Sequence, residues 1–475
     1  MRPAPVRRAP SRPWLVLTAL TLIALGTRAA GADPPAFSTQ APDVGGVSGY
    51  LGLFTSIRLD GGGNPWVSYY DEANGNLKCA HKSAGVWTVE AADNSANDVG
   101  LFTSITIDGS GNPHISYYDQ TNGNLMYAHK SAGVWLKETV DITGDVGKST
   151  SIALSGAGEP RISYYDMTNG TVKFASKTGV AWTLSTATAA GSPGADGIYG
   201  TSLKLDSQGN PSISCYDEAS GALLYAHRNA GIWSVEVADP AGDDVGRFSS
   251  LALDYLDRPQ ISYFDATNQH LKYALKSGGS WSTQTVDATV NVGWDTGIAL
   301  DAGSNPRISY YDANFGFLKY ARRINGVWET YFADLPVADV GSYSSIAMDA
   351  SGRPHISYFD ATAGNLKYAV GNADVTGVGD APAAAAAGLT VYPNPSPGGR
   401  ARIEMREARP AGAQAVEIFD LGGRRVRRLS LDATGGVLWD GLDEGGKHVE
   451  SGIHFVRPVE ADGSLGRARR LVVVR

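Results

Sequence analysis

The sequence predicts an all-β protein in which a seven-bladed β-propeller, closed by the N-terminal strand, is followed by a small C-terminal β-sandwich. Three observations lead to this prediction. A Ser-Tyr-Tyr-Asp motif, or a close variant of it, recurs seven times at intervals of 47 to 51 residues, a period typical of propellers and solenoids. Each interval holds four short stretches of β-branched and aromatic residues separated by turn residues. The 475 residues include 58 Gly and 23 Pro, which suits a protein with many tight turns.

The first 32 residues have the order of charged, apolar and small residues that is typical of a secretory signal peptide. Arginines without any acidic residue come first, an apolar stretch over residues 14–25 follows, and an Ala-Gly-Ala site ends at Ala32. A retained membrane anchor is the alternative, but the apolar stretch is short for a bilayer span. We therefore expect a signal peptide over residues 1–32 and a secreted or cell-surface protein with no membrane span in the mature chain.

One repeat, taken over residues 103–141, shows how the sequence builds a blade. Strands are predicted over residues 103–108, 113–119, 124–130 and 134–140. Gly, Asn and Pro occupy the connections, where they provide the positive or fixed φ angles that tight hairpins need. Four short antiparallel strands per repeat make one propeller blade.

The two ends of the repeat region predict a closed ring. A tryptophan opens the fourth strand in six repeats, but the seventh repeat stops at Val370 without that strand. Near the N-terminus, Phe37-Ser-Thr-Gln40 copies the Trp281-Ser-Thr-Gln segment of the fifth repeat. The N-terminal strand should therefore complete the seventh blade, which removes the free sheet edges. A solenoid would need polar caps, which the sequence lacks, so we place a propeller at residues 33–370.

Seven aspartates, one at the end of each Ser-Tyr-Tyr-Asp motif, are the candidate binding residues of the propeller. Each follows the second strand of its blade, so all seven should gather on one face, which we call the acidic face. Two roles are open: the carboxylates cap their own turns, or they bind Ca²⁺ or a glycan beside Tyr and Trp. No loop matches the spaced D-x-[DN]-x-[DN]-G ligand pattern, so the sequence gives only a weak signal for calcium. Calcium is left open as a ligand, and no other cofactor is expected. The seven are Asp71, Asp119, Asp166, Asp217, Asp265, Asp312 and Asp360.

Further acidic residues and one aromatic residue are expected on the same face. Trp294 lies in the connection before the sixth repeat, and residues 186–200 lengthen an equivalent connection. Both break the symmetry of the ring, which is typical either of a specific site or of drift in a tolerant loop. Aspartates that precede the first strands should join them on this face, namely Asp43, Asp98, Asp145, Asp196, Asp244 and Asp339. The net charge of −8 argues against a nucleic-acid-binding protein.

The sequence offers no recognisable catalytic set. The G-x-S-x-G, H-E-x-x-H and P-loop patterns are absent, although a pair of rim carboxylates for glycoside hydrolysis stays open. The second-strand tyrosines and the tryptophans are predicted to pack between blades. Cys79 and Cys215 occupy tyrosine positions in distant repeats, so we expect two buried thiols and no disulfide. The position after the second-strand proline changes from repeat to repeat, which indicates either no constraint or a single asymmetric site.

The C-terminal residues 389–475, which follow a linker at 371–388, resemble a known family. Short alternating strands and turn residues predict a β-sandwich. The ordered motifs resemble the C-terminal sorting and Ig-like family shared by type IX secretion cargo and flagellar hook-assembly proteins. The resemblance implies an Ig-like domain that serves as a secretion signal or surface attachment, with the secretion machinery as partner. Its motif residues are Tyr392, Pro393, Asn394, Pro395, Trp439, Asp440, Gly441 and Gly452.

These features favour a secreted or cell-surface binding protein over an enzyme. The propeller resembles bacterial surface propellers whose first hairpin reads Asp-x-x-Gly-Asn-Pro, as in Asp60 to Pro65, and it lacks the Ser-x-Asp-x-Gly-x-Thr-Trp box of sialidases. Our main hypothesis is binding or adhesion to a glycan or surface protein through the acidic face. A glycan-active hydrolase or lyase with a site on the propeller rim is the first alternative. A structural spacer without a specific ligand is the second.

Overall fold

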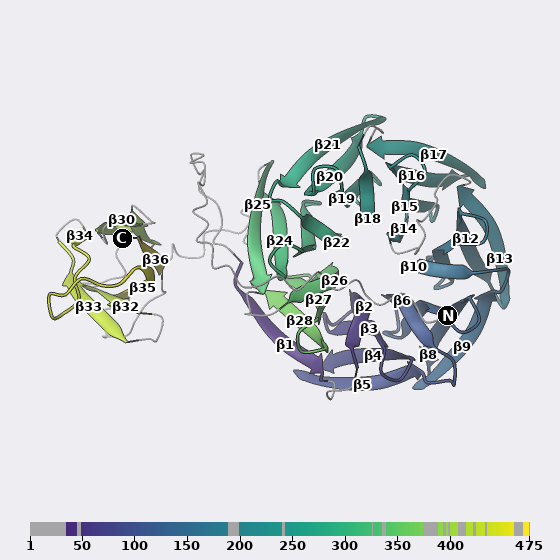
Figure 1. Cartoon of the computed structure of the whole chain (residues 1–475), viewed down its shortest axis with the longest axis horizontal. Helices are drawn as coiled ribbons and strands as arrows, with labels where there is room; N and C mark the ends of the chain where they lie inside the picture. The colour runs from purple at the N-terminus through teal and green to yellow at the C-terminus, as the bar shows by residue number, and fades with distance from the viewer. Residues whose placement is uncertain are drawn as a thin grey trace. The chain divides into compact units, whose positions relative to one another are not determined.

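A computed structural model gives the structure of the chain (Figure 1). In the propeller region it describes residues 35–44, 49–188, 199–239, 243–324, 326–334 and 339–373. In the C-terminal region it describes residues 388–392, 396–397, 400–406, 415–420, 424–432, 435–459 and 469–474. The chain divides into two compact units, residues 1–376 and 377–475. The described part of the chain includes no helix long and apolar enough to cross a membrane.

The first unit is a ring of seven four-stranded antiparallel sheets, which confirms the predicted seven-bladed propeller (Figure 1). In each of the first six blades, the strands follow one another outward in chain order. The innermost strands are β2 (Leu51–Leu59), β6 (Val99–Ile107), β10 (Val146–Leu154), β14 (Thr201–Leu205), β18 (Val245–Leu253), β22 (Val292–Leu300) and β26 (Val340–Met348). The second strands are β3 (Pro65–Asp71), β7 (Pro113–Asp119), β11 (Pro160–Asp166), β15 (Pro211–Asp217), β19 (Pro259–Asp265), β23 (Pro306–Asp312) and β27 (Pro354–Asp360).

The two outer positions of each blade complete the ring. The third strands are β4 (Asn76–Ser83), β8 (Asn124–Ser131), β12 (Thr171–Thr178), β16 (Ala222–Asn229), β20 (His270–Ser277), β24 (Phe317–Ile324) and β28 (Asn365–Gly371). The outermost strands are β5 (Val86–Asp93), β9 (Val134–Asp141), β13 (Ala181–Thr188), β17 (Ile232–Asp239), β21 (Ser280–Asp287), β25 (Val327–Asp334) and, for the seventh blade, β1 (Phe37–Asp43). β1 runs antiparallel to β28, with Phe37 opposite Gly371 and Gln40 opposite Tyr368. The predicted closure by the N-terminal strand is therefore confirmed.

The propeller core consists of separate clusters, each between two neighbouring blades. In one of them, Ile105, Ile115 and Tyr117 of the second blade pack against Leu77 and Cys79 of the first. The prediction that second-strand tyrosines belong to the core is correct, because the tyrosine two residues before the motif aspartate is completely buried in six blades: Tyr69, Tyr117, Tyr164, Tyr263, Tyr310 and Tyr358. The predicted pair of buried free thiols, Cys79 and Cys215, is also present.

Polar side chains join neighbouring blades at these tyrosines. Between the fifth and sixth blades, the Tyr310 hydroxyl donates to Asp287 Oδ2 at 2.7 Å, and Lys319 Nζ lies 2.5 Å from the same oxygen. Burial acts to raise the pKa of Asp287, but the charge and hydrogen bonds of Lys319 and Thr289 hold it below its usual value. Six of the seven junctions contain such an aspartate at the end of an outermost strand: Asp43, Asp93, Asp141, Asp239, Asp287 and Asp334.

The position of Asp43 differs from the sequence prediction, which grouped it with the aspartates that precede first strands. Asp43 ends β1 and lies opposite Leu366 of β28. Its carboxylate accepts hydrogen bonds from the Tyr69 hydroxyl and Lys78 Nζ, each at 2.5 Å. The sequence prediction was wrong because the Val-Gly residues after Asp43 resemble those that precede the first strands of other blades. β1 is an outermost strand, so Asp43 is the equivalent of Asp93 at the end of β5 in the first blade.

The junction between the third and fourth blades is the exception. Thr188, Cys215 and Leu224 stand where the other junctions have the aspartate, the tyrosine and, in most blades, the lysine. All three residues are buried. A single change would leave a charge buried without its partner, which costs far more than replacing the whole group by apolar residues. The joint replacement indicates that the three residues act as one unit.

The tryptophans that open the outermost strands form a second set of links between blades. The indole N–H of Trp135 donates to Glu90 Oε2 at 3.1 Å, and Lys130 Nζ lies 2.5 Å from Glu90 Oε1. Trp87 makes the same bond to Gln40 of β1 at 2.8 Å, which fixes the closing strand. The lysines near these tryptophans are thus engaged in links between blades.

The second unit contains two small sheets. The strand order of one is β29 (Gly388–Tyr392), β31 (Ala401–Arg406), β34 (Gly436–Trp439), and that of the other is β30 (Ser396–Pro397), β36 (Arg469–Val474), β35 (Gly452–Val459), β32 (Ala415–Phe419), β33 (Arg425–Ser430). Residues of both sheets, Ile403, Ile418 and Trp439 among them, form one buried core.

The motif residues of the C-terminal resemblance occupy element ends and a turn. Trp439 is completely buried and donates its indole N–H to the carbonyl of Leu442 at 2.9 Å. Asp440 caps the same turn by accepting the N–H of Leu442, and Gly441 has a φ of 81°. Tyr392 ends β29 and Gly452 begins β35, whereas Pro393, Asn394 and Pro395 lie outside the described residues.

Candidate binding site in the propeller channel

The seven motif aspartates are buried, with 1% to 8% of their surface exposed. Asp71 is typical: its Oδ1 accepts the N–H of Asn74 at 3.2 Å and its Oδ2 accepts the Asn74 side-chain amide at 2.9 Å. These are the hydrogen bonds of the turn-capping alternative. A binding role for these aspartates stays a prediction. Among the described residues, no group of three or more His, Cys, Asp or Glu side chains is placed to hold a metal ion.

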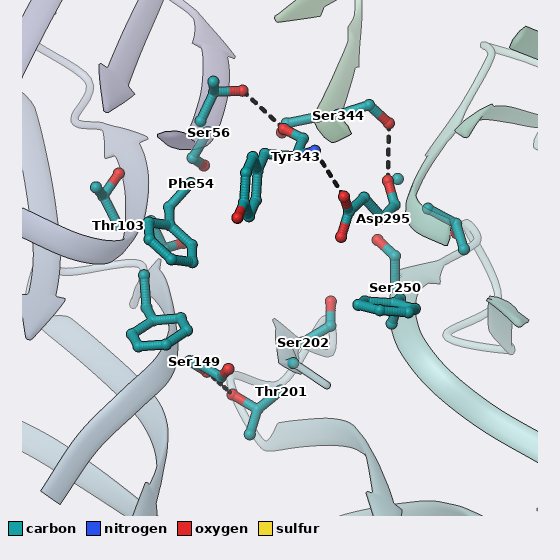
Figure 2. Close-up of a pocket in the computed structure, with 18 of the residues that line it drawn as sticks. Phe54, Ser56, Thr103, Ser149, Thr201, Ser202, Ser250, Asp295, Tyr343 and Ser344 are labelled. Atoms are coloured by element: carbon teal, nitrogen blue, oxygen red, sulfur yellow. Dashed lines mark hydrogen bonds between the residues drawn. The ribbon is translucent and has the colours of Figure 1, made fainter. Parts of the chain in front are cut away.

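A cavity of about 210 Å³ lies where the seven innermost strands meet at the ring axis (Figure 2). Its lining is made of aromatic side chains, serine and threonine hydroxyls, one carboxyl group and one guanidinium group. We call this cavity the channel. Because Leu51 of β2 pairs with Asp71 of β3, the end of the channel nearest the strand starts opens toward the face that holds the motif aspartates.

A ring of residues with left-handed backbone surrounds that end of the channel. The ladder between first and second strands is interrupted there by register shifts, as between Leu53 and Ser56. A positive φ is uncommon outside Gly and Asn and is strained for a bulky side chain. Nevertheless, four of the seven positions carry large aromatic residues. The ring consists of Phe54 (φ 55°), Phe102 (53°), Ser149 (50°), Gly200 (80°), Phe248 (55°), Asp295 (48°) and Tyr343 (55°).

The aromatic members of the ring contact one another. The centroid of the Phe54 side-chain ring lies 4.5 Å from that of Phe102 and 4.7 Å from that of Tyr343. Across the ring, Phe248 lies 5.4 Å from Trp294, the aromatic residue singled out by the sequence. Trp294 is 36% exposed and donates its indole N–H to Asn291 Oδ1. It therefore extends the aromatic surface outward from the channel, whereas most of the long connection over residues 186–200 lies outside the described residues.

Hydroxyl groups form the next two layers of the channel. One residue after the left-handed position, a Thr or Ser links each blade to its neighbour, as in the 2.6 Å contact between the Thr55 and Ser357 hydroxyls. In the layer below, six serines accept a backbone N–H of the next blade, as Ser56 accepts that of Ile105 at 3.2 Å. Their own hydroxyl protons have no acceptor among the described residues, so they are available to a ligand. These serines are Ser56, Ser104, Ser151, Ser202, Ser250 and Ser345.

The sixth blade departs from this pattern at two positions. Gly297 stands where the other blades have the lower serine. Asp295 stands at the left-handed position, where its Oδ2 accepts the N–H of Tyr343 at 2.8 Å and its carbonyl accepts the Ser344 hydroxyl at 2.8 Å (Figure 2). Burial raises the pKa of Asp295 to about 6, against a smaller lowering by the bond from Tyr343. Asp295 is the one carboxyl group among the residues that line the channel.

The raised pKa of Asp295 makes the stability of the protein depend on pH. The folded state holds the Asp295 proton more tightly than the unfolded state, so this stabilisation is complete below about pH 4 and is lost as the pH rises through about 6. Asp295→Asn keeps an acceptor for Tyr343 and tolerates a positive φ. The difference in the free energy of unfolding between D295N and the wild type should therefore change with pH. We expect it to shift in favour of D295N by about 1–2 kcal/mol from pH 4 to pH 7. Urea unfolding at both pH values measures this; an equal difference at the two would contradict the assignment.

A second cavity, of about 300 Å³, lies between the fourth and fifth blades. It exists where the variable position after the second-strand proline holds the small Ser212, in place of residues such as Trp66, His114 or Arg307. Three carboxylates line this cavity, and hydrogen bonds lower the pKa of two of them, Asp206 and Glu236, against the effect of burial. Neither of these two carboxyl groups has the raised pKa that an acid catalyst needs.

Comparisons with known proteins found similar chains among solved structures. No family model matches the sequence, and no curated protein matches it. PorZ of Porphyromonas gingivalis, described as an essential surface component of the type IX secretion system, is 13% identical with a TM-score of 0.45. That alignment covers 89% of this chain but only 59% of PorZ, so the chain spans about three fifths of its length.

Two further solved structures show a similar degree of likeness. The SapL1 lectin, solved with α-methyl fucoside, is 15% identical over 61% of this chain and 99% of the lectin, with a TM-score of 0.43. The Cps50 (Swd1) propeller domain of Myceliophteria thermophila is 10% identical over 70% of this chain and 99% of that domain, with a TM-score of 0.48. At these identities and scores, the comparisons carry no argument about a ligand.

Sequence reasoning did not find the channel residues. Phe54 and its counterparts look like ordinary strand residues in the sequence, because an aromatic residue within a strand pattern does not indicate a positive φ. One signal was present: the aligned repeats place Gly200 and Asp295 at the same position as Phe54, and such residues are typical of a positive φ. Trp294, which the sequence singled out because it breaks the symmetry of the repeats, contacts Phe248 beside the channel, and its binding role stays a prediction.

Proposed function

We propose that this chain is a binding protein whose propeller takes up a glycan at the aromatic end of the channel. The observation that carries the proposal is the set of four aromatic residues held at left-handed positions around the cavity. Each costs about 1–2 kcal/mol relative to Gly, and a structural bulge alone would not require them. Aromatic faces together with hydroxyl donors suit a ligand that has both apolar ring faces and many hydroxyl groups.

The binding function is favoured over a hydrolase by the composition of the channel. Hydrolysis of a glycosidic bond normally uses two carboxyl groups. Asp295 is the one carboxyl group that lines the described channel, and the other functional groups there are aromatic rings, hydroxyls and the Arg58 guanidinium. These groups can bind and orient a saccharide but do not supply an acid and base pair.

The proposed site is tested with serine substitutions, which copy Ser149 at the equivalent position of the third blade. We expect F54S/F102S to lower the affinity for a saccharide found on a glycan array by at least tenfold, because two stacking faces are lost. Phe315→Ala is the matched control, since Phe315 is a 58% exposed aromatic residue outside the channel. Binding that survives F54S/F102S, or an array without any bound saccharide, would contradict the proposal.

We also propose that the protein is exported and that residues 389–475 act as a sorting or surface-attachment domain. The signal-peptide pattern of residues 1–32 and the ordered C-terminal motifs support this proposal. A chain that ends at residue 388 should bind the same saccharide with unchanged affinity but should fail to reach the cell surface. Normal surface display of the shortened chain would overturn the role of the C-terminal domain.

A further inference from the structure

Two cationic side chains occupy equivalent positions on innermost strands in different parts of the ring. Arg58 of β2 pairs with Trp66, and Lys204 of β14 pairs with Ser212, which is the same position of the first-to-second strand ladder. Arg58 lines the channel. The other five innermost strands carry uncharged residues at this position: Thr106, Ala153, Ala252, Ala299 and Ala347. The fold therefore does not require a cation there.

The two cations have no anionic partner among the described residues. Lys204 Nζ makes no hydrogen bond or ion pair with them, and Arg58 donates only to the backbone carbonyl of Ile57 at 2.8 Å. Burial lowers the pKa of both groups, and the charge of Arg58 lowers that of Lys204 further, to about 7. The positive charge of Arg58 therefore acts against that of Lys204, which holds the equivalent position of its own innermost strand. Elsewhere in the propeller, buried cations such as Lys319 and Arg307 have a carboxylate partner.

Hydroxyl donors lie next to both cations. Ser56 is two residues before Arg58 and Ser202 is two residues before Lys204, so each serine is on the same side of its strand as the cation that follows. Both serines line the channel and keep a proton for a ligand. A guanidinium group that lines the cavity, a second cation at the equivalent position of another innermost strand, and two hydroxyl donors together make a site for an anion. Each cation lies four residues after the left-handed position of its own strand, which is roughly 13 Å along the strand from the aromatic end of the channel.

We propose that the channel binds an anionic group, a carboxylate or a sulfate, between Arg58 and Lys204. In combination with the proposed function, on which this part rests, the ligand is an acidic glycan. Its rings stack on the aromatic residues at the channel end while its charged group reaches the two cations. The distance between the two features requires a ligand longer than one pyranose ring. A free inorganic anion has the same chemistry, and the experiment separates the two sources.

The first experiment uses inorganic sulfate and the melting temperature of the full chain. K204A and R58T copy residues found at the same position of other blades, so both variants should fold. At equal ionic strength and relative to chloride, sulfate should raise the melting temperature of the wild type by about 3 °C more than that of either variant. Arg353→Gln, an exposed cation outside the channel, is the control for net charge and should respond like the wild type. An equal sulfate effect in all four proteins would overturn the anion site, whether or not a neutral glycan binds.

The second experiment uses array glycans in pairs that differ only in a carboxylate or sulfate group. Preference for the acidic member in the wild type, lost at least tenfold in K204A and R58T, supports an acidic glycan. Equal binding of both members overturns the acidic glycan and leaves the proposed glycan function intact. A sulfate effect without any bound glycan supports the anion site with a free anion as its ligand, and it is the proposed glycan function that then fails.

Discussion

Replacing Lys319 by leucine is expected to lower the free energy of unfolding by about 3–5 kcal/mol. Lys319 and Asp287 each expose only 7% of their side-chain surface, and Lys319 Nζ lies 2.5 Å from Asp287 Oδ2. Without the lysine, the Asp287 carboxylate stays buried with the Tyr310 hydroxyl as its main remaining side-chain donor. A buried charge without a counter-charge is strongly unfavourable. Urea unfolding of the wild type and K319L at pH 7, followed by tryptophan fluorescence, measures the loss.

The chain itself provides the control for this substitution. The triple variant D287T/Y310C/K319L copies Thr188, Cys215 and Leu224, which fill the junction between the third and fourth blades without any charge. Replacing a complete buried ionic group by apolar residues is often nearly neutral, so the triple variant should recover most of the stability lost in K319L. If it is no more stable than K319L, the loss comes from altered packing of the blade and the charge argument is wrong.

Much of the fold could be predicted because its determinants are local and repeated. Alternating residues, turn glycines and prolines recur in every repeat, so the same four-stranded blade is predicted independently from each of them. Closure followed from one further comparison, that of Phe37-Ser-Thr-Gln40 with Trp281-Ser-Thr-Gln. Asp43 shows where this method fails. Its sequence neighbours suggested one position, whereas its pairing with Leu366, more than three hundred residues away, places it at a junction between blades.

The candidate site was harder to predict because it depends on backbone geometry and on what meets across the ring. Nothing in the sequence around Phe102 indicates a φ of 53°. Likewise, Arg58 and Lys204 are three full repeats apart in the sequence, and only the closed ring lets the charge of one act on the other. The motif aspartates illustrate the reverse. Their repetition made them candidate binding residues in the sequence. In the structure, their carboxylates accept backbone hydrogen bonds from the turns that follow them.

The unpartnered cations lead to a prediction whose sign is opposite to that of most core substitutions. K204A should raise the free energy of unfolding by about 2–3 kcal/mol at pH 6, because it removes a partly buried positive charge that is repelled by Arg58. The folded-state pKa of Lys204, about 7, is below the unfolded value of about 10.4. Between these values the unfolded state binds the additional proton, so the stability of the wild type rises with pH. The advantage of K204A should therefore be full at pH 6 and clearly smaller at pH 9.

This prediction connects the stability of the propeller with its function. A residue that weakens the fold and has alanine at the same position in four other blades is expected where a ligand supplies the missing counter-charge. Saturating sulfate should accordingly reduce the advantage of K204A at pH 6, since the bound anion stabilises only the protein that retains the lysine. Urea midpoints at pH 6 and pH 9, with and without sulfate, test both statements. A K204A protein less stable than the wild type at pH 6 would mean that Lys204 contributes packing or an ion pair, and the channel would then lack the unneutralised charge on which an anion site depends.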